Sequence, residues 1–453
     1  MKVKIKVLLW FDVEDYVTLQ SDDALLLLLD MLNARGVRAV LKFVGEKARV
    51  LKERGRTDIL DKIADHEIGY HTNMHSEHPT VSEFLEPFGF RDGAYEFEKR
   101  EGSGLEDVEA ITSKHSVIYG QPGRAWAPQV FPVIRKWSMP AYVTTIKRVT
   151  VNKKPFWYGG ILNMANLDGQ LRMEFIEDGV EEAKKKFDNF CDGIPASETA
   201  FVSIYYHPCE FATTEFWDAC NFGRGLNTPR EKWKGAPLRT KDEMKNYVDM
   251  LGQFIDYMMS KEYVEFVTSA DVLALEKTDN GHISISDIKT IAKNISNEVY
   301  YYVDKTINLS ASEIFSLFCR YINGDALEPE LLYGPENDIV TDITGKVKVS
   351  DIKRALNMDY PRIFDYKQLP DYFMIGGKRI NPIDMTCTLA SIIRRGSTED
   401  DEADVVKGYL KSRIYVDEES DYSTWIIFPE NFKVPNIRKM AGLQAWTLKP
   451  ALF

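Results

Sequence analysis

Four of the seven histidines in this 453-residue chain fall in one short stretch, HEIGYHTNMHSEH (66–78). His71 and His75 are four residues apart, and a helix or helical turn would place both imidazoles on one face, with Cβ atoms about 5–6 Å apart. That separation suits two ligands of one metal ion, and His78 could share the same face. An isolated pair at this spacing is more often an ordinary surface or core-edge feature, so the metal hypothesis requires an anionic partner.

An acidic cluster, FDVEDY (11–16), follows the first apolar run of the chain, VLLWF (7–11). A strand places Asp12 and Glu14 on one face, and Asp15 joins them only where the chain has already turned. The start of a solvated loop would also be acidic. Because active sites of parallel α/β folds gather at the carboxyl ends of strands, we expect this cluster to provide the missing carboxylate.

The elements that position these residues alternate between strand and helix through the first half of the chain. VLLWF is typical of a strand buried on both faces, and SDDALLLLLDMLNARG (21–36) predicts a helix that stops at Gly36. Further strands are expected at 37–45, 115–120, 141–146, 200–206 and 263–268, and helices around 46–64 and over 240–262. This alternation predicts an α/β fold with a parallel sheet, either open or closed into a barrel.

The pattern changes at LEKTDNGHISISD (275–287), which predicts a division into two domains, 1–277 and 278–453. Two short matches recur in the second part: SDIK at 286–289 and 350–353, and INLSASEIFSLFCRYI (307–322) with a weaker echo in INPIDMTCTLASII (380–393). A degenerate duplication is one explanation of these matches, and chance is the other.

Composition narrows the classes of partner. Hydrophobic residues at 44% and charged residues at 28% are typical of a globular protein, and the net charge of −12 argues against nucleic acid and anionic membranes. No run of about 18 apolar residues predicts a membrane span. The alternation of lysines with apolar residues over 2–7 predicts a strand rather than a signal peptide. Five widely spaced cysteines without a CxxC pair indicate reduced thiols and a cytoplasmic location.

Taken in this order, the two motifs resemble the polysaccharide deacetylase (NodB-homology) family. HEIGYHTNMH is similar to that family's H-E-I-G-N-H-T-x-x-H, and LLLLLDMLNARGVRAVLKFVGEKA resembles the segment that leads into it. The resemblance covers roughly residues 3–275. It implies a distorted (β/α) barrel for this part of the chain, which leaves 278–453 as an additional C-terminal α+β domain.

The resemblance also implies a metal site. His71 and His75 match the two histidine ligands of a divalent metal, which in the family is usually zinc. The third ligand of the family is an aspartate beside the catalytic base. Here Glu14 and Asp15 stand at that place, and strand geometry favours Glu14.

Three further residues match the family's acid–base machinery. Asp12 matches the catalytic base, and Arg124 in GRAWAP (123–128) stands where the family has the arginine that pairs with this base. His207 in IYYHPCEF (204–211) matches the general acid. The family's D-x-x-D-W element has no clear match here, and PFWYGG (155–160) is its candidate replacement. The R-P-P-Y that usually carries the arginine is not kept either.

Amide hydrolysis at neutral pH needs an activated water, a base and an acid for the leaving amine, and this set would provide them. We therefore expect a metal-dependent hydrolase that removes the acetyl group from an N-acetylated sugar. This sugar is expected to be a precursor of surface polysaccharide. Two rivals stay open: an allantoinase-like hydrolase of a non-sugar C–N bond, and a non-catalytic carbohydrate-binding protein. The loop 209–239 is expected to cover the site, with aromatic residues near it: Trp126, Trp157, Tyr158, Phe211, Phe216, Trp217 and Trp233.

Overall fold

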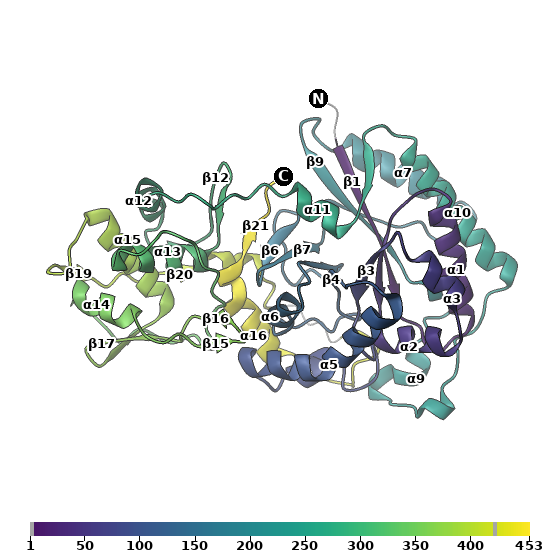
Figure 1. Cartoon of the computed structure of the whole chain (residues 1–453), viewed down its shortest axis with the longest axis horizontal. Coiled ribbons are helices and arrows are strands. Elements are labelled where there is room, and N and C mark those ends of the chain that lie inside the picture. The colour runs from purple at the N-terminus through teal and green to yellow at the C-terminus, as the bar shows by residue number, and fades with distance from the viewer. Residues whose placement is uncertain (1–3, 420–423) are drawn as a thin grey trace.

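The computed structural model describes residues 4–419 and 424–453. Figure 1 shows two parts side by side, a larger body that carries the main sheet and a smaller lobe formed by the chain beyond α11 (Ser269–Leu275). The last segment of the chain, drawn in yellow, returns from the lobe to the body.

The body is built on an eleven-stranded sheet in which neighbouring strands are mostly parallel. Its strands are β1 (Lys4–Val13), β2 (Val40–Phe43), β3 (Glu67–Tyr70), β4 (Ile118–Tyr119), β5 (Ala141–Thr144), β6 (Phe156–Tyr158), β7 (Ile161–Ala165), β8 (Gly169–Leu171), β9 (Thr199–Tyr206), β10 (Val264–Val267) and β21 (Lys449–Pro450). The order is β21-β6-β7-β5-β4-β3-β2-β1-β9-β8, and β10 pairs with the first half of β1. Only β6 runs antiparallel to its two neighbours.

Helices surround this sheet, and most of them contribute to the large core on its outer face, whereas α11 contributes Val272 to the core inside the sheet. They are α1 (Gln20–Asn33), α2 (Gly45–Glu53), α3 (Thr57–Lys62), α4 (Val81–Leu85), α5 (Phe90–Thr112), α6 (Val130–Lys136), α7 (Gly179–Asp192), α8 (Pro208–Ala212), α9 (Ala219–Phe222), α10 (Lys241–Met259) and α11. Short 3₁₀ turns lie at Gly223–Gly225, Arg230–Lys232, Lys411–Tyr415 and Gln444–Thr447. The helix expected around 46–64 is two helices, because Gly55 between them has φ 65°, which ends α2.

Alternation along β1 sorts its side chains between two cores. Leu9, Phe11 and Val13 belong to the large core shared with the helices. Leu8 and Trp10 point to the other face, where they join apolar residues of six further strands in a second core inside the curled sheet. Asp12 continues that inner face toward the carboxyl ends of the strands, which is where the sequence predicts the site.

The predicted α/β fold is confirmed, and the barrel is distorted and open, since β8 and β21 form two unpaired edges within the described residues. The end of the chain completes this body. β21 pairs with β6, Ala451 joins the inner core, and the Phe453 ring lies 4.6 Å from that of Phe201. The division at residue 277 stays a prediction, and the tail beyond 443 packs with the first part of the chain.

The smaller lobe contains helices and two-stranded pairs, as expected for an α+β region. Its elements are β11 (Glu298–Val299), β12 (Tyr302–Asp304), β13 (Ile307–Leu309), β14 (Lys346–Lys348), β15 (Arg362–Ile363), β16 (Tyr366–Lys367), β17 (Phe373–Ile375), β18 (Lys378–Ile380), β19 (Glu402–Asp404), β20 (Tyr409–Leu410), α12 (Ile285–Asn294), α13 (Ala311–Asn323), α14 (Val349–Leu356), α15 (Pro382–Arg395) and, leading back to the body, α16 (Pro435–Leu443). A helix, a hairpin and a second helix occur twice in this order, as α12-β12-β13-α13 and α14-β17-β18-α15. The sequence matches fall on these elements, and duplication remains a hypothesis for them.

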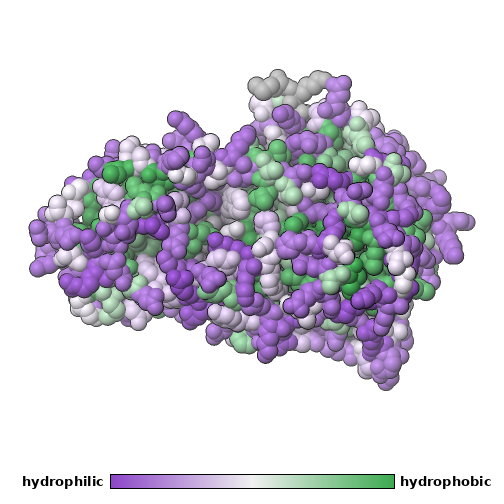
Figure 2. All heavy atoms as spheres, in the orientation of Figure 1, coloured by the Kyte–Doolittle hydropathy of each residue, from purple (hydrophilic) through white to green (hydrophobic). Residues whose placement is uncertain are grey.

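The visible surface is mainly hydrophilic, with separate hydrophobic patches over both parts (Figure 2). Among the helices of the described residues, none combines the length and the apolar character needed to cross a bilayer.

Candidate metal centre

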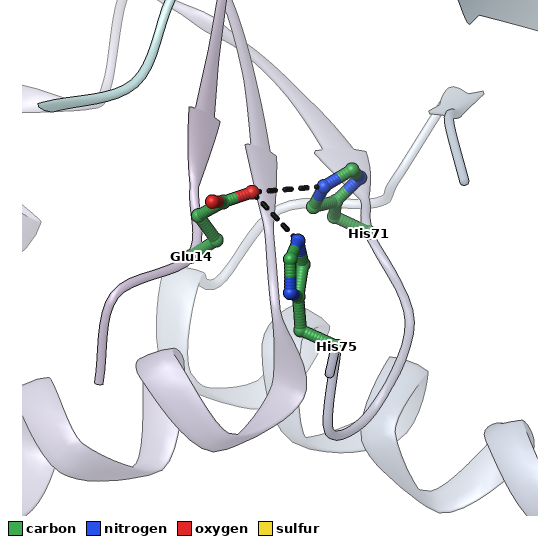
Figure 3. Close-up of side chains that lie close together, drawn as sticks. All are labelled: Glu14, His71 and His75. Atoms are coloured by element: carbon green, nitrogen blue, oxygen red, sulfur yellow. Dashed lines mark hydrogen bonds and ion pairs between the residues drawn. The ribbon is translucent and has the colours of Figure 1, made fainter. Parts of the chain in front are cut away.

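Glu14, His71 and His75 meet at the carboxyl ends of the strands (Figure 3). Glu14 follows β1 directly and His71 follows β3 directly, while His75 lies in the loop after β3. The Glu14 Oε2 atom is 3.2 Å from Nε2 of His71 and 2.8 Å from Nε2 of His75. All three side chains are buried. For comparison, ligand atoms around a tetrahedral zinc ion lie about 3.3 Å apart, given metal–ligand bonds of about 2.0–2.1 Å.

The two histidines converge without a helix, so the helical explanation of their spacing is wrong. Thr72 has φ 69° and His75 has φ 53°, both in the left-handed region, which no helix tolerates. The loop is instead held by its own hydrogen bonds, including one from the His75 N–H to Thr72 Oγ1. The rings of His71 and His75 lie 5.2 Å apart between centroids.

Hydrogen bonds on the far side of each ring determine which nitrogen carries the proton. His71 Nδ1 lies 2.7 Å from the Gly120 carbonyl oxygen, which only accepts, so Nδ1 donates. His75 Nδ1 lies 2.6 Å from Ser76 Oγ, whose own proton goes to Asp218 Oδ2 at 2.7 Å. Ser76 therefore accepts from His75. Whenever either ring is neutral, its bare Nε2 atom faces Glu14.

Two imidazole nitrogens and a carboxylate that converge in this way could share a metal ion. His75 Nε2 is buried and lies 2.8 Å from Glu14 without a well-aligned hydrogen bond. Burial would lower the pKa of His75, but the charge of Glu14 raises it. The donor set of two imidazoles and one carboxylate fits a divalent metal. The other Glu14 oxygen, Oε1, accepts a hydrogen bond from the Trp217 indole at 2.8 Å, which fixes the carboxylate.

Electrostatics at the site favour an ionised carboxylate. Burial alone would raise the pKa of Glu14, but the charges of His75 and His207 and the contacts with His71 hold this pKa well below its usual range. Burial lowers the pKa of His71, which keeps that ring neutral as a metal ligand must be.

Asp12 is paired with a lysine that sequence reasoning missed. Lys42 and Asp12 are register partners on β2 and β1, and Lys42 Nζ lies 2.8 Å from Asp12 Oδ1 with both side chains buried. Burial lowers the pKa of Lys42, although Asp12 opposes this. Glycines make room for the lysine, since a Cβ at Gly69 or Gly120 would overlap its side chain. In the sequence, the signal for this buried ion pair was a lysine inside the otherwise apolar run VLKF (40–43).

Two other predicted residues lie elsewhere. Arg124 is exposed in the loop after β4, and the buried cation that touches Asp12 is Lys42. The Asp15 carboxylate turns away from the histidines, because its Oδ1 accepts from the backbone N–H groups of Val17 and Thr18. Burial raises the pKa of Asp15. Of the two candidate carboxylates, Glu14 is therefore the one that lies with His71 and His75.

His207 stands on the other side of Asp12, at the end of β9. Its Nε2 is 3.6 Å from Asp12 Oδ2 and 4.0 Å from Glu14 Oε2, so Asp12, Glu14 and His207 form a second group that could hold a metal. On the far side, Nδ1 is hydrogen-bonded to Glu210, which orients the ring. Burial lowers the pKa of His207, and the two carboxylates oppose this.

A cavity of about 170 Å³ opens over these groups. Aromatic side chains form much of its wall: Trp10, Tyr205, Phe216 and Trp425. Trp10 and Tyr205 stack at 4.7 Å between centroids, on the inner face of the sheet. Of the aromatic residues expected near the site, Phe216 lines the cavity and Trp217 holds Glu14, whereas Trp126, Tyr158 and Phe211 are buried in the main core. Trp157 and Trp233 do not line it.

Known proteins resemble this chain only distantly. No family model matches the chain, and no curated protein matches its sequence. Solved structures that align with 60% of this chain include proteins assigned as polysaccharide deacetylases from Mycobacterium smegmatis (15% identity, 89% of that chain, TM-score 0.39) and Pseudomonas aeruginosa (14%, 90%, 0.39). An allantoinase aligns over the same share (12% identity, 89% of that chain, TM-score 0.38). These values are too low to carry an argument about family or activity.

Proposed function

We propose that this protein is a metal-dependent hydrolase that removes the acetyl group from an N-acetylated sugar. Glu14, His71 and His75 hold the metal, and zinc is the ion that we propose. The observation that carries the proposal is the pair of bare Nε2 atoms that face Glu14 Oε2 at 3.2 and 2.8 Å in a buried site. This convergence of two nitrogens on one carboxylate oxygen supports a shared metal ion.

A divalent metal in this place would supply Lewis-acid polarisation of the acetyl oxygen and would make a water nucleophilic at neutral pH. The remaining chemistry belongs to the chain. Asp12, beside the site, is the base that removes a proton from the attacking water. Lys42 at 2.8 Å balances the charge of Asp12 and fixes its orientation.

His207 is the general acid in this proposal. The amine of an amide leaves poorly unless it is protonated, and His207 Nε2 faces the cavity within 4.0 Å of both carboxylates. Its other nitrogen donates to Glu210, so the proton available for transfer is the one on Nε2.

A sugar substrate is supported by the walls of the cavity. Trp10, Tyr205 and Phe216 provide aromatic surface, on which the apolar faces of sugar rings pack. Gln121, Thr144 and Thr145 provide polar groups for hydroxyls. We further propose that the substrate is a precursor of a surface polysaccharide, as expected from the sequence.

Acetate release tests this function. The protein is freed of metal with a chelator, reloaded with zinc, and assayed on N-acetylglucosamine, its oligomers and allantoin. We expect acetate release from a sugar only in the reloaded protein. Hydrolysis of allantoin alone would favour the rival C–N hydrolase. Binding of sugars without any hydrolysis by the zinc-loaded protein would favour a carbohydrate-binding role.

A further inference from the structure

We infer that Trp425 restricts the substrate to a free N-acetylated unit or one at the end of a chain, and excludes units in the interior of a polymer. The inference rests on the proposed function. Trp425 comes from the far end of the sequence, 350 positions beyond His75, yet lines the same cavity. Its ring lies 6.0 Å from that of His75, edge to face.

The segment that carries Trp425 is tied to the body directly after the tryptophan. The backbone N–H groups of Arg224 and Gly225 donate to the carbonyls of Ile426 and Ile427, at 2.8 and 3.1 Å. Ile427 is fully buried in a cluster with Tyr16 and Trp217, which also belong to the neighbourhood of the metal site. Trp425 itself packs against this cluster, so the body positions it in the wall.

Gly123 shows that the indole is closely fitted into its place. A Cβ atom at Gly123 would overlap the indole of Trp425, so only glycine allows the loop after β4 to pass under the ring. Gly123 also has φ 43°, a conformation that other residues adopt at a cost. The loop and the returning segment thus close one side of the cavity together.

Phe216 closes another side, from the loop 209–239, and its ring lies 4.9 Å from that of His207. The space between these walls, about 170 Å³, is smaller than the roughly 300–1,000 Å³ of pockets for drug-sized ligands. One sugar unit is the size of ligand that such a space admits. A unit inside a polymer must extend in two directions, and the inference assigns Trp425 the role of blocking one of them.

Position-resolved deacetylation tests the inference. The zinc-loaded full-length protein and Trp425→Ala are incubated with the β-1,4-linked tetramer of N-acetylglucosamine, and tandem mass spectrometry locates the units that have lost acetate. We expect the unsubstituted protein to act on terminal units, and Trp425→Ala to raise the interior-to-terminal ratio about tenfold, because a steric barrier to the larger substrate is gone. Trp425→Phe should give an intermediate ratio. Ile426→Ala is the matched control, since that side chain is 49% exposed on the same segment.

A second measurement separates this inference from the proposed function. Cobalt-loaded proteins are titrated with acetohydroxamate and with a hydroxamate that carries a disaccharide, and the visible spectrum reports binding without turnover. Trp425→Ala should tighten only the larger ligand, again about tenfold. Equal action on interior and terminal units, or unchanged hydroxamate selectivity in Trp425→Ala, would overturn the inference. Intact cobalt spectra without acetate release from any sugar would instead overturn the proposed function, and the hydroxamate result would then decide the inference alone.

Discussion

The two pairs of histidines within residues 66–78 differ in the partners of their ring nitrogens. His66 and His78 have protein partners on both nitrogens. His66 Nδ1 accepts from the Ala39 N–H and Nε2 lies 2.9 Å from Asn33 Oδ1, while His78 lies between Glu83 Oε2 and the Phe222 carbonyl. The Nδ1 atoms of His71 and His75 have separate partners, but their two Nε2 atoms converge on the single oxygen Glu14 Oε2, at 3.2 and 2.8 Å.

This contrast teaches how to recognise a site among buried polar groups. A histidine whose two nitrogens each have a separate protein partner stabilises the fold, whereas two rings that converge on one carboxylate oxygen suit the binding of a shared metal ion. Histidine count and spacing do not distinguish the two kinds. The proposal therefore depends on the Nε2 atoms of His71 and His75.

The largest effect is expected for Asp12→Asn. Asparagine keeps the size of the side chain but does not accept the proton of the water, so the rate should fall about 10²–10⁴-fold, the typical contribution of general base catalysis. Bound metal should stay at the level of the unsubstituted protein, because Asp12 is assigned as base and not as ligand. Loss of metal with full activity after reconstitution would show that Asp12 is a ligand.

His207→Ala should slow an N-acetyl sugar more than an activated acetyl ester, because the ester's leaving group needs no proton. The ratio of the two rates is the measurement. An equal effect on both substrates would indicate that His207 has a structural role, like that of His66.

Lys42→Met tests the buried ion pair between Lys42 and Asp12. Breaking a buried pair leaves an uncompensated charge, so the free energy of unfolding should fall by about 3–5 kcal/mol. Lys6→Met is the matched control on β1, since its partner Glu265 is 64% exposed and an exposed pair contributes at most about 1 kcal/mol. Chemical denaturation of both variants measures the difference. Equal losses would mean that the Lys42–Asp12 pair is not buried as described.

Ser76→Ala should weaken metal binding about 10–100-fold, the usual effect of removing a group that orients a ligating histidine. Ser76 fixes the proton on His75 Nδ1 through its hydrogen bond to Asp218. Competition with a chelator measures the affinity. Thr80→Ala, which removes a helix cap near His78, is the control that should leave the metal affinity unchanged.

The smallest effect concerns His66, whose pKa burial lowers to about 4. The unfolded chain, with an ordinary histidine pKa of about 6.5, binds the proton first as the pH falls. Stability is therefore lost on acidification, by about 2 kcal/mol between pH 7 and pH 5. His66→Gln should remove this part of the pH dependence and keep the metal. Urea denaturation at several pH values measures the free energy of unfolding. If this free energy fell with pH as steeply in His66→Gln as in the unsubstituted protein, the assignment would be contradicted.

Much of the fold followed from the sequence, because strands buried on both faces and amphipathic helices leave clear patterns in VLLWF and in 240–262. The carboxyl-end location of Asp12 and Glu14 followed from the same alternation. What could not be predicted depends on long-range register. Lys42 meets Asp12 only because β2 pairs with β1 residue for residue, and Trp425 reaches the cavity only because the chain returns from the lobe. The loop conformation before His75 also left no local signal, since Thr72 is β-branched and such residues rarely adopt a left-handed backbone.

Metal content after purification tests the central claim most directly. Three proteins are compared: the unsubstituted protein, His71→Ala/His75→Ala and His66→Gln/His78→Gln. Each is exchanged into metal-free buffer, mixed with one equivalent of zinc and dialysed, and its zinc content is measured by elemental mass spectrometry. We predict close to one zinc per chain in the first and third proteins and almost none in the second, with circular dichroism showing that all three are folded. Unchanged zinc in His71→Ala/His75→Ala, or its loss in His66→Gln/His78→Gln alone, would contradict the account.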